Sequence, residues 1–285
     1  MITLDQLRSC LTDVELVDPD DPTRWRTGTL GLAGGHVFGG QMIGQAAMIA
    51  ARTFPDMAVK SVDVVFPRGA RDTGSLDYDV TTLHAGTAYA TLRIDSSQPG
   101  RDGTPAVGFG ATVMCHRPAP GVEHHQPMPE SAGQPDDARP VDLGLLPWET
   151  RIVGDSDLDD RRAQPNELSL WWRVGERLDD DPAVHQAVHQ ALLAFGTELT
   201  LIGTALLPHG EWSQRDAHVA LRTSVIGHHV LFHRPFRIDE WLLVTQTSPV
   251  ATGGSAFGTG HVYTAAGELV ASFAQQSMIR VEEAS

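Results

Sequence analysis

Hydrophobic and polar positions along the chain follow two different periods, and the same order of periods occurs twice. From Gly39 to Thr53 small and apolar residues recur at helical spacing, and Pro55 follows, so the pattern predicts a helix. Beyond it, apolar and polar residues alternate with a period of two, as in a strand with one buried face. This alternation predicts strands over residues 76–83, 88–94 and 106–115, with a turn at residues 98–103.

The second block of the chain repeats this order. Asp181 followed by Pro182 is a typical helix start, because an acid caps the N-terminus and proline fits the first helical position. Apolar residues then recur every three or four positions as far as Leu206, which predicts one long helix with a buried stripe. Pro208 and Gly210 end this helix. The pattern beyond it predicts strands over residues 219–230, 242–247, 257–263 and 269–279.

A polar segment separates the two blocks. Residues 117–164 are dense in Pro, Asp and Glu, which indicates a connector that few backbone contacts cross. We therefore expect an N-terminal unit over residues 1–116, this connector, and a C-terminal unit over residues 165–285. A helix and several antiparallel strands in each block predict an α+β fold, in which a sheet wraps around a helix in each unit.

Composition and charge narrow the class of protein. The 285 residues fit two domains of ordinary size, and a hydrophobic content of 41% is enough to form a core. The net charge of −15, with no basic stripe, argues against a nucleic-acid partner, although an anionic small molecule can still bind at a local site. Cys10 and Cys115 are too few for a disulfide framework, and neither a membrane span nor a signal peptide is apparent. We therefore expect a cytoplasmic protein.

Short motifs in both blocks resemble those of the acyl-CoA thioesterase II family, in the family's order and spacing. In the first block they are Phe38-Gly39-Gly40-Gln41 with Gly44-Gln45, and Phe66 with Arg68-Gly69. In the second block they are Val188-His189-Gln190, Leu207-Pro208-His209-Gly210, Phe232-His233-Arg234-Pro235-Phe236 and Glu240-Trp241-Leu242-Leu243. The resemblance implies a double hotdog fold and the hydrolysis of acyl-CoA to free fatty acid and CoA, without metal or cofactor.

The resemblance also implies a catalytic site in the second block, where a carboxylate, a hydroxyl and a glutamine hold and activate water. The carboxylate position is Glu198, where the family usually has Asp, and the glutamine position is Gln275. Glu198 lies at the flank of the expected helix stripe, where partial burial raises a carboxyl pKa toward that of a useful base. Gln275 and Gln276 adjoin in an expected strand, so one of them faces the core unless this is a solvated edge strand.

The hydroxyl position departs from the family. It is Val225, where Thr or Ser is usual, and Gly227-His228 stands where the family has Asp-His. Ser224 cannot simply substitute for Val225, because neighbours in a strand face opposite sides. Thr223 shares the face of Val225 but lies about 6.6–6.8 Å away along the strand. A bulge at Gly227, or a shifted alignment, would let Thr223 or Ser224 supply the hydroxyl.

The first helix and a following turn are candidates for binding the substrate's CoA and thioester. A helix that starts at Gly39 and Gly40, followed by Gln41, offers free N–H groups to a thioester oxygen. Alternatively, the glycines only permit tight packing of the helix on the sheet. Arg68 is a candidate for the nucleotide phosphates.

A metal site is the less favoured interpretation of the 13 histidines. His185 and His189 have the helical spacing of zinc ligands, but no Glu follows His185 and no third ligand stands at motif spacing. We expect no metal.

Two other functions compete with hydrolysis of acyl-CoA. Val225 favours a non-catalytic, or very slow, acyl-CoA or acyl-carrier binding protein of the same fold. A hotdog hydratase or dehydratase normally needs an Asp/His pair, and the nearest histidine after Glu198 is His209, so this alternative is disfavoured. Because double hotdogs resemble fused dimers, a further homo-oligomer is an open expectation.

Overall fold

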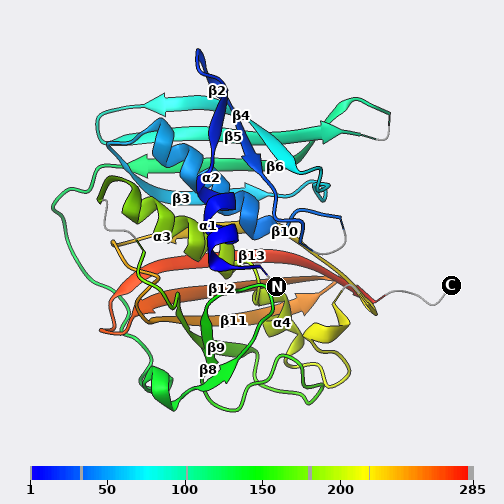
Figure 1. Ribbon diagram of the computed structural model, residues 1–285. Coiled ribbons are helices and arrows are strands. Elements are labelled where there is room, and N and C mark those ends of the chain that lie inside the picture. Colours follow the sequence, from blue (N-terminus) through cyan, green and yellow to red (C-terminus); the bar gives the residue numbers. More distant parts are fainter. Residues whose placement is uncertain (1, 33–34, 101, 179–181, 218, 282–285) are drawn as a thin grey trace. The chain divides into compact units, whose positions relative to one another are not determined.

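The computed structural model describes residues 2–32, 35–100, 102–178, 182–217 and 219–281 (Figure 1). Contacts divide the chain into two compact units that are interleaved in sequence. Unit 1 comprises Met1–Glu123, Leu178–Gly196 and His229–Phe232, and unit 2 comprises His124–Arg177, Thr197–His228 and His233–Ser285. Among the described residues, no helix is long and apolar enough to cross a membrane.

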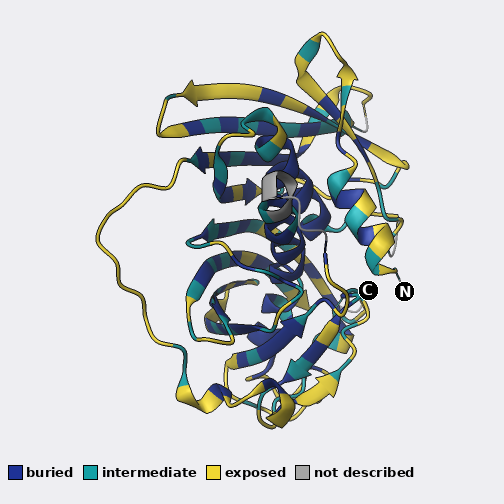
Figure 2. Cartoon of the chain, turned by 60° about the vertical axis from the view of Figure 1, so that its left-hand side comes forward, coloured by how far each residue is buried: buried dark blue, intermediate teal, exposed yellow. Residues whose placement is uncertain are grey.

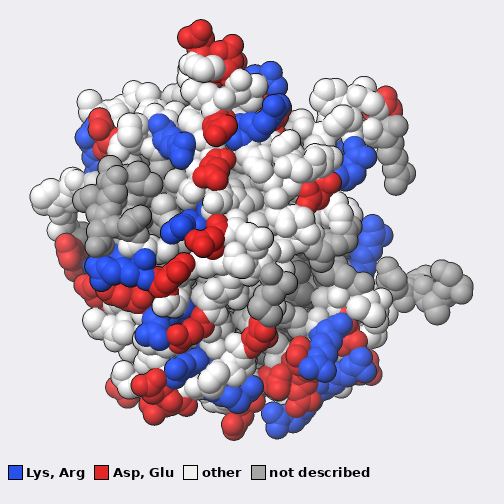
Figure 3. All heavy atoms as spheres, in the orientation of Figure 1, with Lys and Arg blue, Asp and Glu red and all other residues white. Residues whose placement is uncertain are grey.

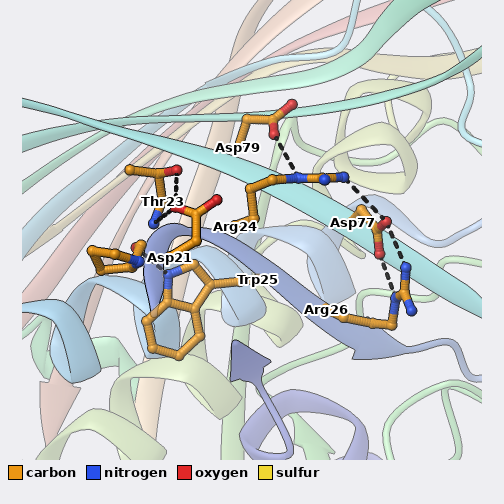
Figure 4. Close-up of polar contacts among 8 residues, drawn as sticks. Asp21, Thr23, Arg24, Trp25, Arg26, Asp77 and Asp79 are labelled. Atoms are coloured by element: carbon orange, nitrogen blue, oxygen red, sulfur yellow. Dashed lines mark hydrogen bonds and ion pairs between the residues drawn. The ribbon is translucent and has the colours of Figure 1, made fainter. Parts of the chain in front are cut away.

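Unit 1 contains an antiparallel sheet that includes the three strands predicted for the first block. Its strands follow the order β1 (Glu15–Asp18), β2 (Asp21–Gly28), β4 (Ser75–Ala85), β5 (Tyr89–Pro99), β6 (Pro105–His116) and β3 (Ala58–Val65). The strands β1 to β3 and the helix α1 (Leu4–Thr12) were not predicted from the sequence. On the exposed side of this sheet, Arg24 and Arg26 of β2 face Asp79 and Asp77 of β4 as ion pairs (Figure 4).

Helix α2 (Gly39–Thr53) is the centre of unit 1 and has the predicted bounds. Every residue from Gly40 to Ala50 is buried (Figure 2), because the helix contacts α1 on one side and the strands β3 and β6 on another. Such a helix is apolar or small on all its faces rather than along one stripe. This explains its glycines, alanines and methionines.

Unit 2 contains the second antiparallel sheet, which includes the four strands predicted for the second block. Its strands follow the order β10 (Leu221–Phe232, whose last four residues belong to unit 1), β13 (Leu269–Val281), β12 (Ser255–Thr264), β11 (Leu242–Thr252), β9 (Glu167–Arg173), β8 (Glu149–Ile152) and β7 (Arg139–Val141). Strand β9 was not predicted.

The segment 117–164 is more ordered than its composition suggests. It contains β7, β8 and two 3-10 turns, Glu130–Ala132 and Pro135–Asp137. Ala132 and Ala138 are buried against Trp171, whose indole Nε1 donates a hydrogen bond of 3.3 Å to the carbonyl of Ala132. Small side chains beside prolines allow the polar segment to cover an apolar part of the sheet.

The long helix predicted as far as Leu206 is interrupted, and on this point the prediction was wrong. Helix α3 (Pro182–Thr197) ends, and helix α4 (Leu201–Leu206) begins after a turn over residues 198–200. Glycine and β-branched threonine are weak helix formers, and Gly196, Thr197 and Thr200 cluster at this point. The hydroxyl groups of Thr197 and Thr200 also contact side chains of the unit 2 strands, His228 and Gln246.

Acidic and basic side chains are interspersed on the face of the molecule shown in Figure 3. Elsewhere in the molecule, basic and acidic side chains form ion pairs, such as those of Arg93 with Asp95 and Arg173 with Glu149. On this face the charged side chains are therefore of mixed sign and do not form a single acidic field.

Candidate active site

Glu198 lies in the turn between α3 and α4 and is only 6% exposed. It was expected on the flank of a continuous helix with half of its surface covered, so the structure buries it further than the sequence indicated. Burial raises the pKa of its carboxyl group to about 8, from 4.5. A carboxyl group of this kind can accept a proton from water near neutral pH.

Gln275 lies on β13 with its side chain on the buried face of the unit 2 sheet. It is 2% exposed, whereas the adjacent Gln276 is exposed, as strand geometry predicts for neighbours that face opposite sides. The register of β12 against β13 places Gly258 directly opposite Gln275. The alternative of a solvated edge strand does not apply, because β13 lies between β10 and β12.

A chain of buried hydrogen bonds leads from the turn that carries Glu198 to Gln275. Nε2 of His228 lies 3.1 Å from Oγ1 of Thr197, the residue before Glu198. Nδ1 of the same ring lies 2.9 Å from Oε1 of Gln275, whose Nε2 donates a bond of 3.1 Å to Oγ of Ser277. The four residues joined by these hydrogen bonds, Thr197, His228, Gln275 and Ser277, are each at most 2% exposed.

A second contact brings the same two segments together from the other side of Glu198. Leu201, at the start of α4, packs so closely on Gly258 that a Cβ atom there would lie 2.6 Å from Cδ2 of the leucine. Gly258 is the ladder neighbour of Gln275. Glu198 is thus held between Thr197 and Leu201, and both of these residues contact the strands around Gln275.

The three candidates for the hydroxyl position lie on β10 in different environments. Ser224 is exposed, and its hydroxyl donates a 3.2 Å bond to the carbonyl of the adjacent Val225. Val225 is half-buried, and Thr223 is 5% exposed. The buried positions change from odd to even numbers between Thr223 and His228, which indicates an irregularity near Gly227.

Helix α2 explains most of the motif residues of the first block by packing. A Cβ atom at Gly40 would overlap the backbone oxygen of Phe195 in α3, so the glycine permits close approach of two helices rather than of helix and sheet. The buried amide of Gln41 bonds to the backbone of Gly28 and Leu30. Gly39 is half-buried at the helix start.

The remaining candidates for ligand binding are less constrained. Arg68 is exposed in the loop between β3 and β4. Among the described residues no group of three potential metal ligands is present, and the side chain of His185 lies outside those residues. His189 is fully buried within α3.

His228 and Thr197 are the site residues that sequence reasoning did not assign. In the sequence, His228 stands out only as part of the Gly227-His228 departure from the family pattern, which assigns it no role. A histidine within a strand of otherwise apolar inward positions was the one available signal, because a buried imidazole requires hydrogen-bond partners. Thr197 gave no signal of its own beyond its position beside Glu198.

A buried central helix with an antiparallel sheet fits the expected hotdog architecture, and unit 2 buries both the carboxyl group of Glu198 and the amide of Gln275. Two family models match the chain. The model described as acyl-CoA thioesterase matches residues 166–279, and the one described as acyl-CoA thioesterase N-terminal domain matches residues 28–116.

Named relatives and solved structures agree with these matches. Acyl-coenzyme A thioesterase 8 of Homo sapiens is 26% identical, over 97% of this chain and 91% of the relative. Acyl-CoA thioesterase 2 of Haemophilus influenzae is 25% identical, over 87% and 89%. The crystal structure of an acyl-CoA thioesterase II from Mycobacterium marinum has a TM-score of 0.80 at 28% identity, over 97% of this chain and 99% of that chain. A hot dog fold protein from Alicyclobacillus acidocaldarius has a TM-score of 0.75 at 16% identity, over 99% and 100%, which concerns the fold alone.

The chain belongs to the acyl-CoA thioesterase II family, and the protein is an acyl-CoA thioesterase with the double hotdog fold. The fold and the family expected from the motifs are therefore confirmed. The family matches favour a hydrolase over a hydratase and over a non-catalytic binding protein.

Proposed function

We propose that the protein hydrolyses fatty acyl-CoA by direct attack of a water molecule, with Glu198 as general base and Gln275 as hydrogen-bond donor. The ionised carboxylate of Glu198 takes a proton from water while the water oxygen bonds to the thioester carbonyl carbon. The carbonyl oxygen becomes an oxyanion, to which an N–H group of Gln275 donates. When the tetrahedral intermediate collapses, the C–S bond breaks, and the proton on Glu198 passes to the sulfur of the departing CoA.

The burial of Glu198 is the single observation that carries this proposal. A carboxyl group with a pKa of about 8 holds its proton far more strongly than an exposed glutamate, so its ionised form is the stronger base. An ionised carboxylate in an apolar setting also costs free energy, so a chain that keeps a carboxyl group there offers a candidate functional site. The contacts of Thr197 with β10 and of Leu201 with β12, the two strands that flank β13, support this pairing of Glu198 with Gln275.

The side chain at Val225 sets the expected rate. The side chain of valine cannot donate or accept a hydrogen bond, so it cannot help Glu198 to hold the attacking water. Loss of one hydrogen-bonding partner slows such chemistry by about ten- to a thousandfold without abolishing it. We therefore expect slow but measurable turnover.

Binding of the CoA moiety and the setting of the enzyme complete the proposal. Arg68, which is exposed, is suited to the nucleotide phosphates, and the N–H groups at Gly39 and Gly40 remain candidates for substrate contacts. The backbone N–H of Gln41 is already used, because it donates to the carbonyl of Phe38 at 3.1 Å. The free cysteines Cys10 and Cys115 fit a reducing compartment, which supports a location in the cytoplasm. The proposed substrate, fatty acyl-CoA, would place the reaction in fatty acid metabolism. Two expectations from the sequence remain predictions. One is that the protein forms a homo-oligomer, and the other is that its two units comprise residues 1–116 and 165–285.

Release of free thiol from medium- and long-chain acyl-CoA is the test. Wild-type protein is expected to release CoA above the uncatalysed rate, and Glu198→Gln is expected to abolish that release because the base is lost. Glu268→Gln is the matched control, since Glu268 is exposed. Equal activity of Glu198→Gln and wild type would show that another group is the base.

A further inference from the structure

We propose that His228 is a positioning residue, which holds the amide of Gln275 so that an N–H group, and never the carbonyl oxygen, faces the reacting thioester. This inference rests on the proposed function, because it specifies how Gln275 acts. It assigns a role to a residue that the sequence motifs left without one.

The hydrogen bond between the two side chains fixes which atom is which. Nδ1 of His228 lies 2.9 Å from Oε1 of Gln275, and an amide oxygen can only accept, so Nδ1 carries the hydrogen. A neutral ring then has its lone pair at Nε2, 3.1 Å from the hydroxyl oxygen of Thr197. The imidazole thus engages both segments of the site with opposite edges.

The other end of the Gln275 amide is fixed as well. Its Nε2 donates to Oγ of Ser277 at 3.1 Å, which uses one of its two N–H groups. Among the residues that the structure describes, none accepts the second N–H. A buried N–H without an acceptor is uncommon in proteins, and here it belongs to a residue that is linked through His228 to the turn that carries Glu198. An oxyanion formed on a bound thioester would satisfy this N–H.

The His228 ring is itself held in place. It stacks on Phe273, with ring centroids 6.2 Å apart and planes inclined by 25°. Phe273 in turn lies across Gly260, where a Cβ atom would overlap its ring. His228 is 2% exposed, so the packing leaves little freedom for rotation. The donor that orients Gln275 is therefore in place before substrate binds, which is the condition for effective stabilisation of an oxyanion.

Loss of His228 has a specific chemical consequence. Without a donor at Oε1, the Gln275 amide can turn by half a rotation about its terminal bond, because the two orientations have nearly the same shape. The carbonyl oxygen would then face the oxyanion and repel it. We expect the cost in kcat and not in KM, since the N–H is needed most in the transition state.

Two substitutions of His228 separate positioning from a merely structural role. In His228→Asn the side-chain nitrogen stands close to the place of Nδ1, whereas in His228→Gln it stands close to the place of Nε2. We expect His228→Asn to keep kcat within about threefold of wild type, and His228→Gln and His228→Leu to lose about 30- to 100-fold with KM little changed. Thermal unfolding of each variant shows the temperature range in which all are folded.

A double-mutant cycle with Gln275→Ala completes the test. If His228 acts through Gln275, then Gln275→Ala in the His228→Leu background lowers kcat no further. Equal losses in His228→Asn and His228→Gln, or losses of His228→Leu and Gln275→Ala that multiply, would overturn the inference. If His228→Leu does not fold, the comparison of Asn with Gln decides.

The same experiments distinguish failure of the proposed function from failure of the role proposed for His228. Wild-type kcat in Gln275→Ala, or a wild type without turnover, would refute the proposed mechanism and this inference together. Loss of activity in Gln275→Ala with full activity in both His228→Gln and His228→Leu would refute only the role of His228.

Discussion

Nδ1 of His228 lies 2.9 Å from Oε1 of Gln275, although 47 residues separate the two in the chain. The bond joins strand β10 to strand β13, and the opposite edge of the imidazole contacts the hydroxyl of Thr197 in the last position of α3. One buried ring therefore connects the three segments that carry the candidate base, the glutamine and the altered hydroxyl position. A change in this ring would therefore alter the contacts of Gln275 and of Thr197, the residue before Glu198.

The pH dependence of the reaction follows from the pKa of Glu198. Only the ionised carboxylate accepts a proton, and burial raises its pKa to about 8. We expect kcat/KM to rise about tenfold per pH unit below that pH and to become constant above it. The measurement is thiol release over a pH series, corrected for spontaneous thioester hydrolysis. A constant kcat/KM between the ordinary glutamate pKa of 4.5 and about 8 would contradict the assignment of Glu198 as the base.

Because of the same pKa shift, Glu198 lowers the free energy of unfolding at high pH. Its pKa is raised in the folded state, so between pH 4.5 and about 8 the folded protein holds a proton that the unfolded chain has released. The free energy of unfolding then falls with pH by about 1.4 kcal/mol per unit in this window. We expect Glu198→Gln to be as stable as wild type at the low end of this window and more stable, by a few kcal/mol at most, at its high end. Denaturant unfolding at both ends measures the difference, and a difference independent of pH would contradict it.

Restoring the family's hydroxyl tests the position of Val225. Val225→Thr is nearly isosteric, and the position is half-buried, so the hydroxyl group is accommodated at little cost. We expect kcat to rise about tenfold, which corresponds to about 1.4 kcal/mol of transition-state stabilisation, with little change in KM. Steady-state kinetics measures both parameters.

Its controls are the two neighbouring hydroxyls. Ser224→Ala is expected to leave kcat unchanged, because Ser224 faces solvent. If instead Thr223→Val lowers kcat by about ten- to a thousandfold and Val225→Thr has no effect, the irregularity near Gly227 already brings the hydroxyl of Thr223 into the site.

The sequence was informative where periodicity is strong. The bounds of α2 were predicted at both ends, because its pattern of small residues is uninterrupted and a proline follows. Strands β4 to β6 and β10 to β13 were predicted to within a few residues from alternation. The short edge strands β1 and β7 bury few side chains, so their sequences carry almost no alternation to detect.

Two features of the site could not be predicted from the sequence, because both depend on tertiary contacts or on an irregular strand. The break at Glu198 depends on hydrogen bonds that Thr197 and Thr200 make to side chains on β10 and β11, and such tertiary contacts override helix propensity. The role of His228 depends on the change of phase in β10, which places it on the buried face with Thr223. A strand pattern read with a strict period of two puts these residues on opposite faces.

Because α2 packs closely on α3 in unit 1, we expect the stability of the protein to be unusually sensitive to a substitution at Gly40. A methyl group there would overlap the backbone oxygen of Phe195 and the ring of Phe38, and a backbone atom within a helix cannot move aside as the end of a side chain can. We expect Gly40→Ala to destabilise the protein by about 1–3 kcal/mol, despite alanine's higher helix propensity. Gly28→Ala is the matched control, because nothing lies within 4 Å of a Cβ atom at that position. Thermal and denaturant unfolding of both variants measures the effect, and a Gly40→Ala variant as stable as wild type would show that α2 and α3 are not in contact at this point.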